Sequence, residues 1–306
     1  MSGKMISIIG SYNVGLFLKG RRLPEFGETV IADMFHEGGG GKGSNQAIAC
    51  AMFEANTRFI GTLGADKYGL DALEMYREYG IDTENIQIDT TTHSGISIIL
   101  IDDHGNNIIS VAPGANLNYS SDDLEHAADI LKASLIVGFQ LENDHAMVFY
   151  GIRKVKALGV MTFLDPAPAV ELPTDLYPDI DIIKPNETEA TILTGITVND
   201  IESAEDAGRD LIAKGVKMAI VTLGREGAVY VSESGVKYFP AKRVDAIDST
   251  GAGDIFSGGL LASLSRGDTM EDAIRFATAA ATLSTTKLGV IESIPKRKDV
   301  EKFMRN

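Results

Sequence analysis

Residues 248–254 read DSTGAGD, a stretch that places a carboxylate directly behind a turn of small residues. The next segment, 255–265, is mostly apolar and predicts a helix, so the backbone amides of residues 251–254 fall in its unpaired first turn. Glycines there let a phosphate approach the backbone. Asp254 could then accept a proton from a substrate hydroxyl that attacks the γ-phosphorus. An aspartate that only caps a core helix is the alternative.

A second motif, GGGGKGSNQA, spans residues 38–47 and runs into a segment with a helical pattern. Its glycines satisfy the spacing G-x-G-x-x-G, but they do not lie in the first βα turn, where a dinucleotide-binding fingerprint belongs. The P-loop pattern fails because Lys42 is followed by Gly43 rather than by Ser or Thr. We expect a tight backbone turn carrying Asn45, whose side-chain amide can donate to and accept from a polyol.

Together the two motifs resemble the paired signatures of the ribokinase-like (PfkB) carbohydrate kinases, and the resemblance runs along the whole chain. The glycine run resembles the sugar-binding signature of that family, and residues 248–254 resemble its catalytic signature. Between them, PNETE at 185–189 is similar to the N-x-x-E element near the Mg²⁺-phosphate site, and TLGREG at 222–227 to the nucleotide-binding turn. The resemblance implies ATP-dependent phosphorylation of a primary hydroxyl, with ribose or a related pentose as the leading substrate.

The resemblance also implies a role for each matching residue. Asp254 is the general base, and the amides of Gly251, Ala252 and Gly253 form the anion hole. Sugar contacts are implied for Asn13, Gly15, Gly41, Lys42, Gly43, Asn45, Glu142 and Asp254. ATP contacts are implied for Asn186, Glu189, Thr222, Gly224, Gly227, Gly253 and Thr278, with Glu189 ordering the water shell of Mg²⁺. A K⁺ site is implied at Asp248, Thr250, Ser284, Lys287, Gly289 and Ser293, several of them through backbone carbonyls.

Simpler interpretations remain for two of the nucleotide residues. Asn186 is also a good helix N-cap, and Thr278 lies in an Ala-rich segment where it could serve helix packing alone.

One element departs from the family pattern. Where the family has N-x-D after its first strand, this chain has Asn13-Val14-Gly15, so a carboxylate that grips two ring hydroxyls is missing. This puts ribose itself in question, although Glu142 compensates in part. Restoring a carboxylate at position 15 is expected to improve ribose binding. A nearby basic cluster is either a solvated edge or a sign of an anionic substrate such as a sugar acid or sugar phosphate: Lys19, Arg21 and Arg22.

Short apolar runs alternate with amphipathic ones, which is typical of an α/β fold with a mostly parallel sheet. Strands are predicted at 5–9, 57–61, 134–138, 160–164, 180–183 and 217–222. Helices are predicted near 44–54, 67–79, 121–132, 145–158, 186–194, 202–214, 252–265 and 270–286. Hairpins are predicted for 227–232 with 236–239 and for 96–101 with 107–111.

The resemblance implies that this sheet is the centre of a three-layer α/β/α sandwich, formed by one domain over residues 1–306. Segments of about 14–36 and 94–112 form a small β lid over the sugar, and its outer face is the expected homodimer surface. A lid suits a kinase, since water must not take the phosphoryl group.

Composition agrees with these expectations. A net charge of -15 argues against nucleic-acid and membrane partners, which call for basic patches. The lone Cys50 excludes a disulfide framework, and the five His show no metal-ligand spacing. The expected protein is therefore soluble, unprocessed and cytoplasmic, with a small-molecule sugar and ATP as its partners.

Three alternatives stay open at this point. The substrate could be another sugar, a sugar acid or a nucleoside. A sugar-binding regulator without turnover is a second possibility, although a pure binder has no need of a base beside an anion hole. An NAD-dependent oxidoreductase rests only on the glycine spacing.

Overall fold

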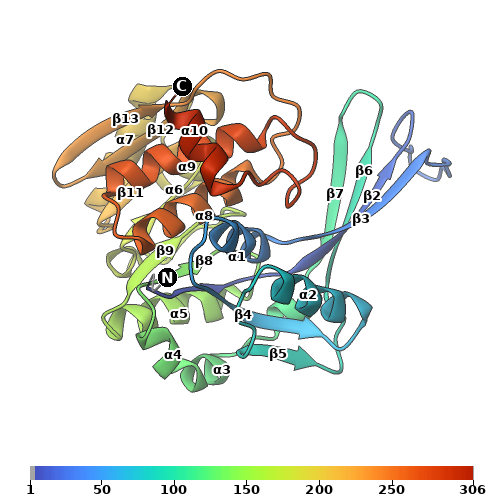
Figure 1. Cartoon of the computed structure of the whole chain (residues 1–306), viewed down its shortest axis with the longest axis horizontal. Coiled ribbons are helices and arrows are strands. Elements are labelled where there is room, and N and C mark those ends of the chain that lie inside the picture. Colours follow the sequence, from blue (N-terminus) through green and yellow to red (C-terminus); the bar gives the residue numbers. More distant parts are fainter. Residues whose placement is uncertain (1–3, 306) are drawn as a thin grey trace.

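The computed structural model describes residues 4–305 and contains two sheets (Figure 1). The strands of the large sheet are Ile6–Ile9 (β1), Thr57–Gly64 (β4), Ile86–Asp89 (β5), Ile136–Phe139 (β8), Met161–Leu164 (β9), Ile182–Ile183 (β10), Met218–Thr222 (β11), Gly227–Ser232 (β12) and Gly235–Pro240 (β13). Their order is β13-β12-β11-β10-β9-β8-β1-β4-β5, and all pairs are parallel except those made by β12. The central strand β1 reads ISII and is wholly buried, as expected where helices cover both faces.

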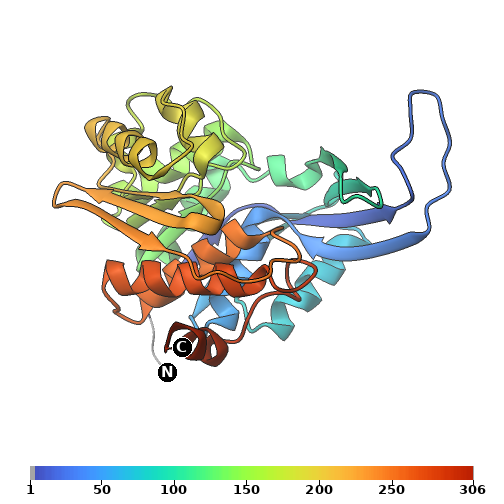
Figure 2. The same ribbon diagram turned by 90° about the horizontal axis from the view of Figure 1, so that it is seen from above.

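Helices cover both faces of this sheet (Figure 2). One face carries Lys42–Met52 (α1), Lys67–Glu78 (α2), Ala252–Ser265 (α8), Met270–Ser284 (α9) and Arg297–Arg305 (α10). The other carries Ser121–His126 (α3), Ala128–Lys132 (α4), His145–Ala157 (α5), Glu187–Thr194 (α6) and Ile201–Ala213 (α7). A hydrophobic core lies on each side, so the predicted three-layer α/β/α architecture is confirmed. In the described part of the chain no helix has the length and apolar character of a membrane span.

The small sheet projects from one side of the molecule (Figures 1 and 2). Its strands are Asn13–Lys19 (β2), Met34–Gly40 (β3), Gly95–Ile101 (β6) and Asn107–Ala112 (β7), in the order β3-β2-β6-β7. The central pair β2 and β6 is parallel, whereas both outer pairs are antiparallel. The predicted hairpin of 96–101 with 107–111 is therefore present.

The glycine run differs from its prediction. Gly38 to Gly40 continue strand β3, and helix α1 begins at Lys42, so the turn shrinks to Gly41, which has φ 91°. Asn45 consequently lies in the first turn of α1, in agreement with the helix predicted near 44–54. An Ala or larger residue would not fit two positions later, because a Cβ on Gly43 would lie 2.6 Å from the Cα of Gly10. This contact packs the start of α1 directly against the end of β1.

Other helix and strand boundaries also differ from the predicted ones. The predicted helix 121–132 is broken at Ala127 into α3 and α4, and the predicted lid segment of about 14–36 contains residues 20–33 outside the strands β2 and β3. Two elements were not predicted: the short edge strand β5 and the C-terminal helix α10.

Candidate active site

Several of the predicted site residues lie at one edge of the large sheet. In parallel sheets, ligands bind beyond the carboxyl ends of the strands. Here Glu142 follows β8, Asn186 follows β10 and Thr222 ends β11, while Asp254 lies at the start of α8. The order of the strands thus brings together motifs from distant parts of the chain.

In the turn before α8, the backbone lies close to the side chain of Val290. Gly251 is the N-cap with φ 75°, and a Cβ there would lie 2.4 Å from Cγ1 of Val290. The Ala252 amide donates to the Ser249 carbonyl at 3.2 Å, so it is already engaged. Of the three amides in the predicted anion hole, that of Ala252 therefore has a backbone partner, and the role of Gly251, Ala252 and Gly253 in binding an anion stays a prediction.

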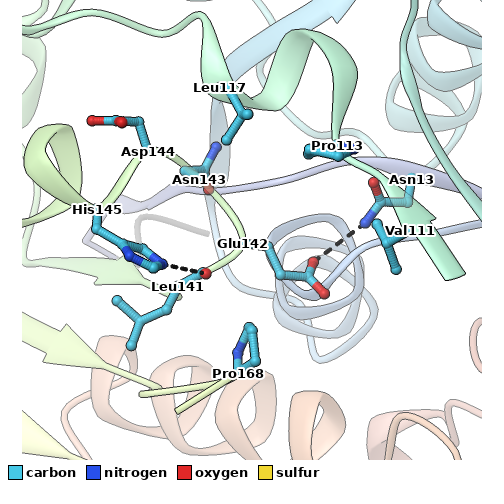
Figure 3. A pocket seen from close by; sticks show the side chains of 10 residues that line it. All are labelled: Asn13, Val111, Pro113, Leu117, Leu141, Glu142, Asn143, Asp144, His145 and Pro168. Atoms are coloured by element: carbon cyan, nitrogen blue, oxygen red, sulfur yellow. Dashed lines mark hydrogen bonds between the residues drawn. The ribbon is translucent and has the colours of Figure 1, made fainter. Parts of the chain in front are cut away.

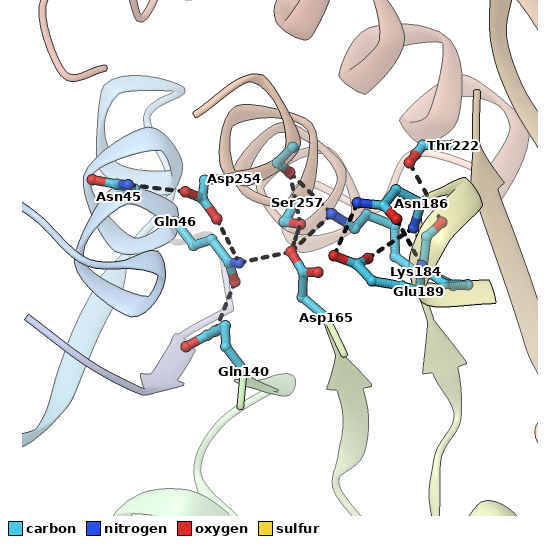
Figure 4. A network of polar contacts seen from close by, with 12 residues as sticks. Asn45, Gln46, Gln140, Asp165, Lys184, Asn186, Glu189, Thr222, Asp254 and Ser257 are labelled. Atoms are coloured by element: carbon cyan, nitrogen blue, oxygen red, sulfur yellow. Dashed lines mark hydrogen bonds and ion pairs between the residues drawn. The ribbon is translucent and has the colours of Figure 1, made fainter. Parts of the chain in front are cut away.

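Asp254 is buried, with 6% of its surface exposed, and both of its carboxylate oxygens accept hydrogen bonds (Figure 4). Asn45 donates from Nδ2 to Oδ2 at 2.9 Å, and Gln46 donates from Nε2 to Oδ1 at 3.2 Å. The two signature motifs therefore meet, although these contacts join residues 209 and 208 positions apart. Burial raises the pKa of the Asp254 carboxyl, Asp165 raises it further, and Lys42 opposes the rise.

Lys42 supplies positive charge at the same place. Burial works against its ammonium charge, but the carboxylates of Asp254, Asp165, Glu142 and Glu189 raise its pKa above the ordinary value. A lysine that stays charged among these carboxylates can meet the oxygens of a phosphate.

Glu142 and Asn13 line a cavity of about 380 Å³ (Figure 3). Oε2 of Glu142 accepts from Ser11 Oγ at 2.5 Å, from the Lys42 amide at 3.0 Å and from Asn13 Nδ2 at 3.4 Å. Asp254 is not among the residues that line this cavity. The cavity is lined by Asn13, Val111, Pro113, Leu117, Leu141, Glu142, Asn143, Asp144, His145 and Pro168.

The place of the missing carboxylate is filled by an aromatic ring. Gly15 pairs with Gly38 across β2 and β3, and the next pair on the same face is Phe17 with His36. A Cβ on Gly15 would lie 2.6 Å from Cε2 of Phe17, and one on Gly38 would lie 3.2 Å from Nε2 of His36. Gly15 has ordinary extended backbone, so the Phe17 ring, and not the backbone, stands against a side chain there.

Gly15→Asp alone should therefore leave the KM for ribose nearly unchanged. Combined with Phe17→Ala it should lower this KM about fivefold, because charge-assisted hydrogen bonds to sugar hydroxyls contribute about 1 kcal/mol net. Steady-state kinetics on ribose would check this, with Phe17→Ala alone as the control. An equal gain in the single and double variants would show that the ring is no obstacle.

The basic cluster lies at the far end of the small sheet from Asn13. Lys19 ends β2, about 20 Å along the strand at the usual rise per residue. Arg22 is half exposed and pairs with Glu28. These positions favour a solvated edge over recognition of an anionic substrate.

The nucleotide residues meet beside α6. Asn186 caps this helix: its Oδ1 accepts from the Glu189 amide at 2.8 Å, and Glu189 accepts from the Asn186 amide at 2.8 Å and from its Nδ2 at 2.9 Å. The Thr222 amide donates to the Pro185 carbonyl at 2.9 Å, which joins the two motifs. Gly224 and Gly227 bound the short turn Gly224–Glu226 that follows. The N-cap interpretation of Asn186 is thus correct and leaves its nucleotide role open.

Thr278 lines a separate cavity of about 180 Å³ between β13, α9 and α10. Its hydroxyl donates to the Ile274 carbonyl at 2.8 Å, as the helix-packing interpretation expects. Phe239 and Ala279 line the same cavity and give it apolar walls.

The two segments of the predicted K⁺ site lie together. The carboxylate of Asp248 accepts from the Thr250 amide at 2.9 Å and from the Gly289 amide at 3.1 Å. The Thr285 carbonyl accepts from the amides of Ile247 and Asp248 at 2.7 and 3.1 Å. Ser284 and Ser293 are buried nearby in sequence, and the Ser284 carbonyl accepts from the Lys287 amide at 3.1 Å.

Three buried residues of the site were not predicted. Gln46, Asp165 and Lys184 connect Asp254 to the strand ends, supported by Gln140 and Ser257. A signal was available, because Asp165 directly follows the strand 161–164 and Lys184 directly follows 182–183. Charged residues at the carboxyl ends of buried parallel strands are natural site candidates.

A buried carboxylate at a helix start, a lysine among carboxylates and polar side chains at the carboxyl edge of the sheet are typical of a phosphotransferase site. The pfkB family carbohydrate kinase model matches residues 4–297. The ribokinase of Staphylococcus aureus is 38% identical over 303 residues, covering 98% of this chain and 99% of that protein. The deoxyribokinase of Salmonella typhi is 33% identical and covers 98% of each. The structure of Arabidopsis thaliana ribokinase with ribose and ATP is 30% identical, covers all of both chains and has a TM-score of 0.92.

The chain belongs to the pfkB family of carbohydrate kinases. It is a ribokinase-like sugar kinase, as the sequence predicted.

Proposed function

We propose that this protein transfers the γ-phosphoryl group of ATP to a primary hydroxyl of a pentose, with ribose as the leading substrate and deoxyribose next. The observation that carries this is the meeting of Asn45, from the sugar signature, with the buried base Asp254 at the start of α8. The relatives support it, since ribokinases and a deoxyribokinase match along almost the whole chain.

In the proposed reaction, Asp254 accepts the proton of the attacking hydroxyl. The first-turn amides of α8 stabilise the negative charge that develops on the transferred group, and Lys42 adds a positive charge. Asn45 contacts both the base and the sugar, while Glu142 and Asn13 hold the other hydroxyls through acceptor and donor atoms.

Asn186 and the turn at 222–227 would contact the nucleotide, and the cavity beside Thr278 would take the adenine. Mg²⁺ would neutralise phosphate charge, with its water shell ordered by Glu189. The residues fit such an ion, because Mg²⁺ is usually held by one or two carboxylates together with phosphates and water.

A K⁺ site formed by Asp248 and the 284–293 segment should make activity rise with K⁺ at fixed Mg²⁺. Sodium should substitute poorly, since carbonyl-rich sites discriminate cations by size. The measurement is kcat/KM in potassium, sodium and a large organic cation at matched ionic strength. Equal values in all three would show that no functional site exists there.

The small sheet would act as a lid within a single domain, keeping water from the phosphoryl group. Its face opposite the cavity carries a row of apolar residues across all four strands: Phe35, Leu18, Leu100 and Ile108 are register neighbours. Phe35 and Ile108 are more than half exposed, at 61% and 52%. We therefore propose a homodimer through this face, since exposed apolar patches of this kind mark interaction sites.

The test of the proposed function is an ADP-release screen across pentoses, deoxypentoses, hexoses, sugar acids and nucleosides. Highest kcat/KM on a pentose would support the proposal. Highest activity on a nucleoside or sugar acid would overturn the substrate while leaving the kinase class in place. No turnover on any of them would favour a sugar-binding regulator.

A further inference from the structure

A buried chain of polar side chains links Asp254 to an ion pair that the proposed chemistry does not use (Figure 4). Gln46 is its middle member: Nε2 donates to Oδ2 of Asp165 at 2.9 Å and to Oδ1 of Asp254 at 3.2 Å. Gln140 donates from Nε2 to Oε1 of Gln46 at 2.7 Å. Because ionised carboxylates only accept, the amide nitrogen of Gln46 must face them, and Gln140 holds it in that orientation.

The other end of the chain is the ion pair itself. Asp165 follows β9 and Lys184 follows the neighbouring strand β10, so parallel pairing places them side by side. Lys184 Nζ lies 2.8 Å from Oδ2 of Asp165, and the two side chains are only 4% and 2% exposed. Lys184 also donates to the Gly253 carbonyl at 3.3 Å, and Ser257 donates to Asp165 at 3.0 Å. The pair is thus fixed to the first two turns of α8, through Gly253 and Ser257.

Each element that faces Asp254 contributes a charge or a donor. From α1 come Lys42, Asn45 and Gln46; from the end of β9 comes Asp165; from the end of β10 comes Lys184. Burial raises the pKa of Asp254; Asp165 raises it, while Lys42, Asn45 and Lys184 lower it. The two members of the ion pair therefore act on the base in opposite directions.

We propose that Asp165 and Lys184 are positioning residues that set, with Gln46, the orientation and the ionisation of the base Asp254. This rests on the proposed function, in which Asp254 must be ionised to accept the proton. Gln46 and Asn45 each donate to one oxygen of Asp254, so the plane of the carboxylate is fixed. The ion pair holds Gln46 in place, and its two opposite charges offset each other's effect on Asp254.

The test is the pH dependence of kcat/KM on ribose or deoxyribose, whichever is turned over faster, at saturating ATP and Mg²⁺. Asp165→Asn keeps an oxygen for Gln46 and Ser257 but removes a negative charge, so the acid limb should move to lower pH by about 1 unit. Gln46→Met removes a donor to the ionised base, so the limb should move to higher pH. The double variant Asp165→Asn/Lys184→Met removes both charges and should bring the limb back toward that of the parent.

The control is Asp181→Asn. Asp181 is a buried carboxylate paired with Lys156 at 2.7 Å, but it precedes β10 and so lies at the opposite edge of the sheet. This variant should leave the limb in place. Loss of activity in Asp165→Asn at every pH, with the limb unmoved, would show a merely structural role and overturn the proposal.

The double variant gives a second test. If its KM for ATP is raised and its acid limb does not move back toward that of the parent, Lys184 would be assigned to phosphate binding, and the proposal would likewise be overturned. The base assignment is tested separately by Asp254→Asn. If that variant is inactive and Asp165→Asn does not move the limb, only the present inference fails. If Asp254→Asn stays active, the proposed base fails first.

Discussion

Asp254→Asn should lower kcat by about 10²–10⁴-fold while ATP still binds. The substitution removes the proton acceptor but keeps the shape of the side chain and leaves the first-turn amides of α8 in place. Single-turnover kinetics would measure the loss, and calorimetric titration with ATP would measure nucleotide binding.

Asp245→Asn makes the same chemical change at an exposed position shortly before the catalytic signature, and it should retain parental kcat. A kcat near that of the parent in Asp254→Asn would exclude Asp254 as the base. Loss of ATP binding together with activity would point to a folding defect at the start of α8.

Lys184→Met should lower the free energy of unfolding by about 3–5 kcal/mol, because it leaves the buried carboxylate of Asp165 without its charged partner. Adding Asp165→Asn should recover most of this loss, since a neutral pair of similar volume needs no compensating charge. Urea unfolding at neutral pH, followed by circular dichroism, would measure both variants.

Lys237→Met is the matched control, since Lys237 pairs with Glu271 on the surface, where ion pairs contribute little. Its unfolding midpoint should stay close to that of the parent. If the Lys184→Met single and double variants were equally destabilised, the loss would come from packing around Lys184 and not from an unpaired charge.

Much of the fold could be predicted because the large sheet is made of short, fully buried apolar strands separated by amphipathic helices. Strand β5 was not predicted because its sequence, IQID, is short and contains no apolar run, as expected for a strand that is largely accessible. Helix α10 follows the last recognised motif and is rich in charged residues. The glycine run suggested a turn, but glycines also suit a strand whose partner, β2, approaches closely.

The candidate site likewise contains residues that could be predicted from the sequence and contacts that could not. Asn45, Glu142, Asn186 and Asp254 could be predicted because each stands in a recognisable local pattern. The contact of Gln46 with Asp165 joins residues 119 positions apart, and spacing along the chain carries no information about such a pair. Which amide of the helix start remains free likewise depends on the Ser249 carbonyl, a backbone detail that composition does not encode.

The residues around Gly15 and the residues around Asp254 lie on different sheets, so mutations can change one set without the other. Gly15, Phe17 and His36 belong to the small sheet, whereas Asp254, Gln46, Asp165 and Lys184 belong to the large sheet and its helices. Under the proposed function, a mutation in the small sheet is therefore expected to alter which sugar is accepted without disturbing the buried network around Asp254. We expect a laboratory library confined to β2 and β3 to change substrate preference while the residues around Asp254 stay intact, and evolution could proceed by the same route.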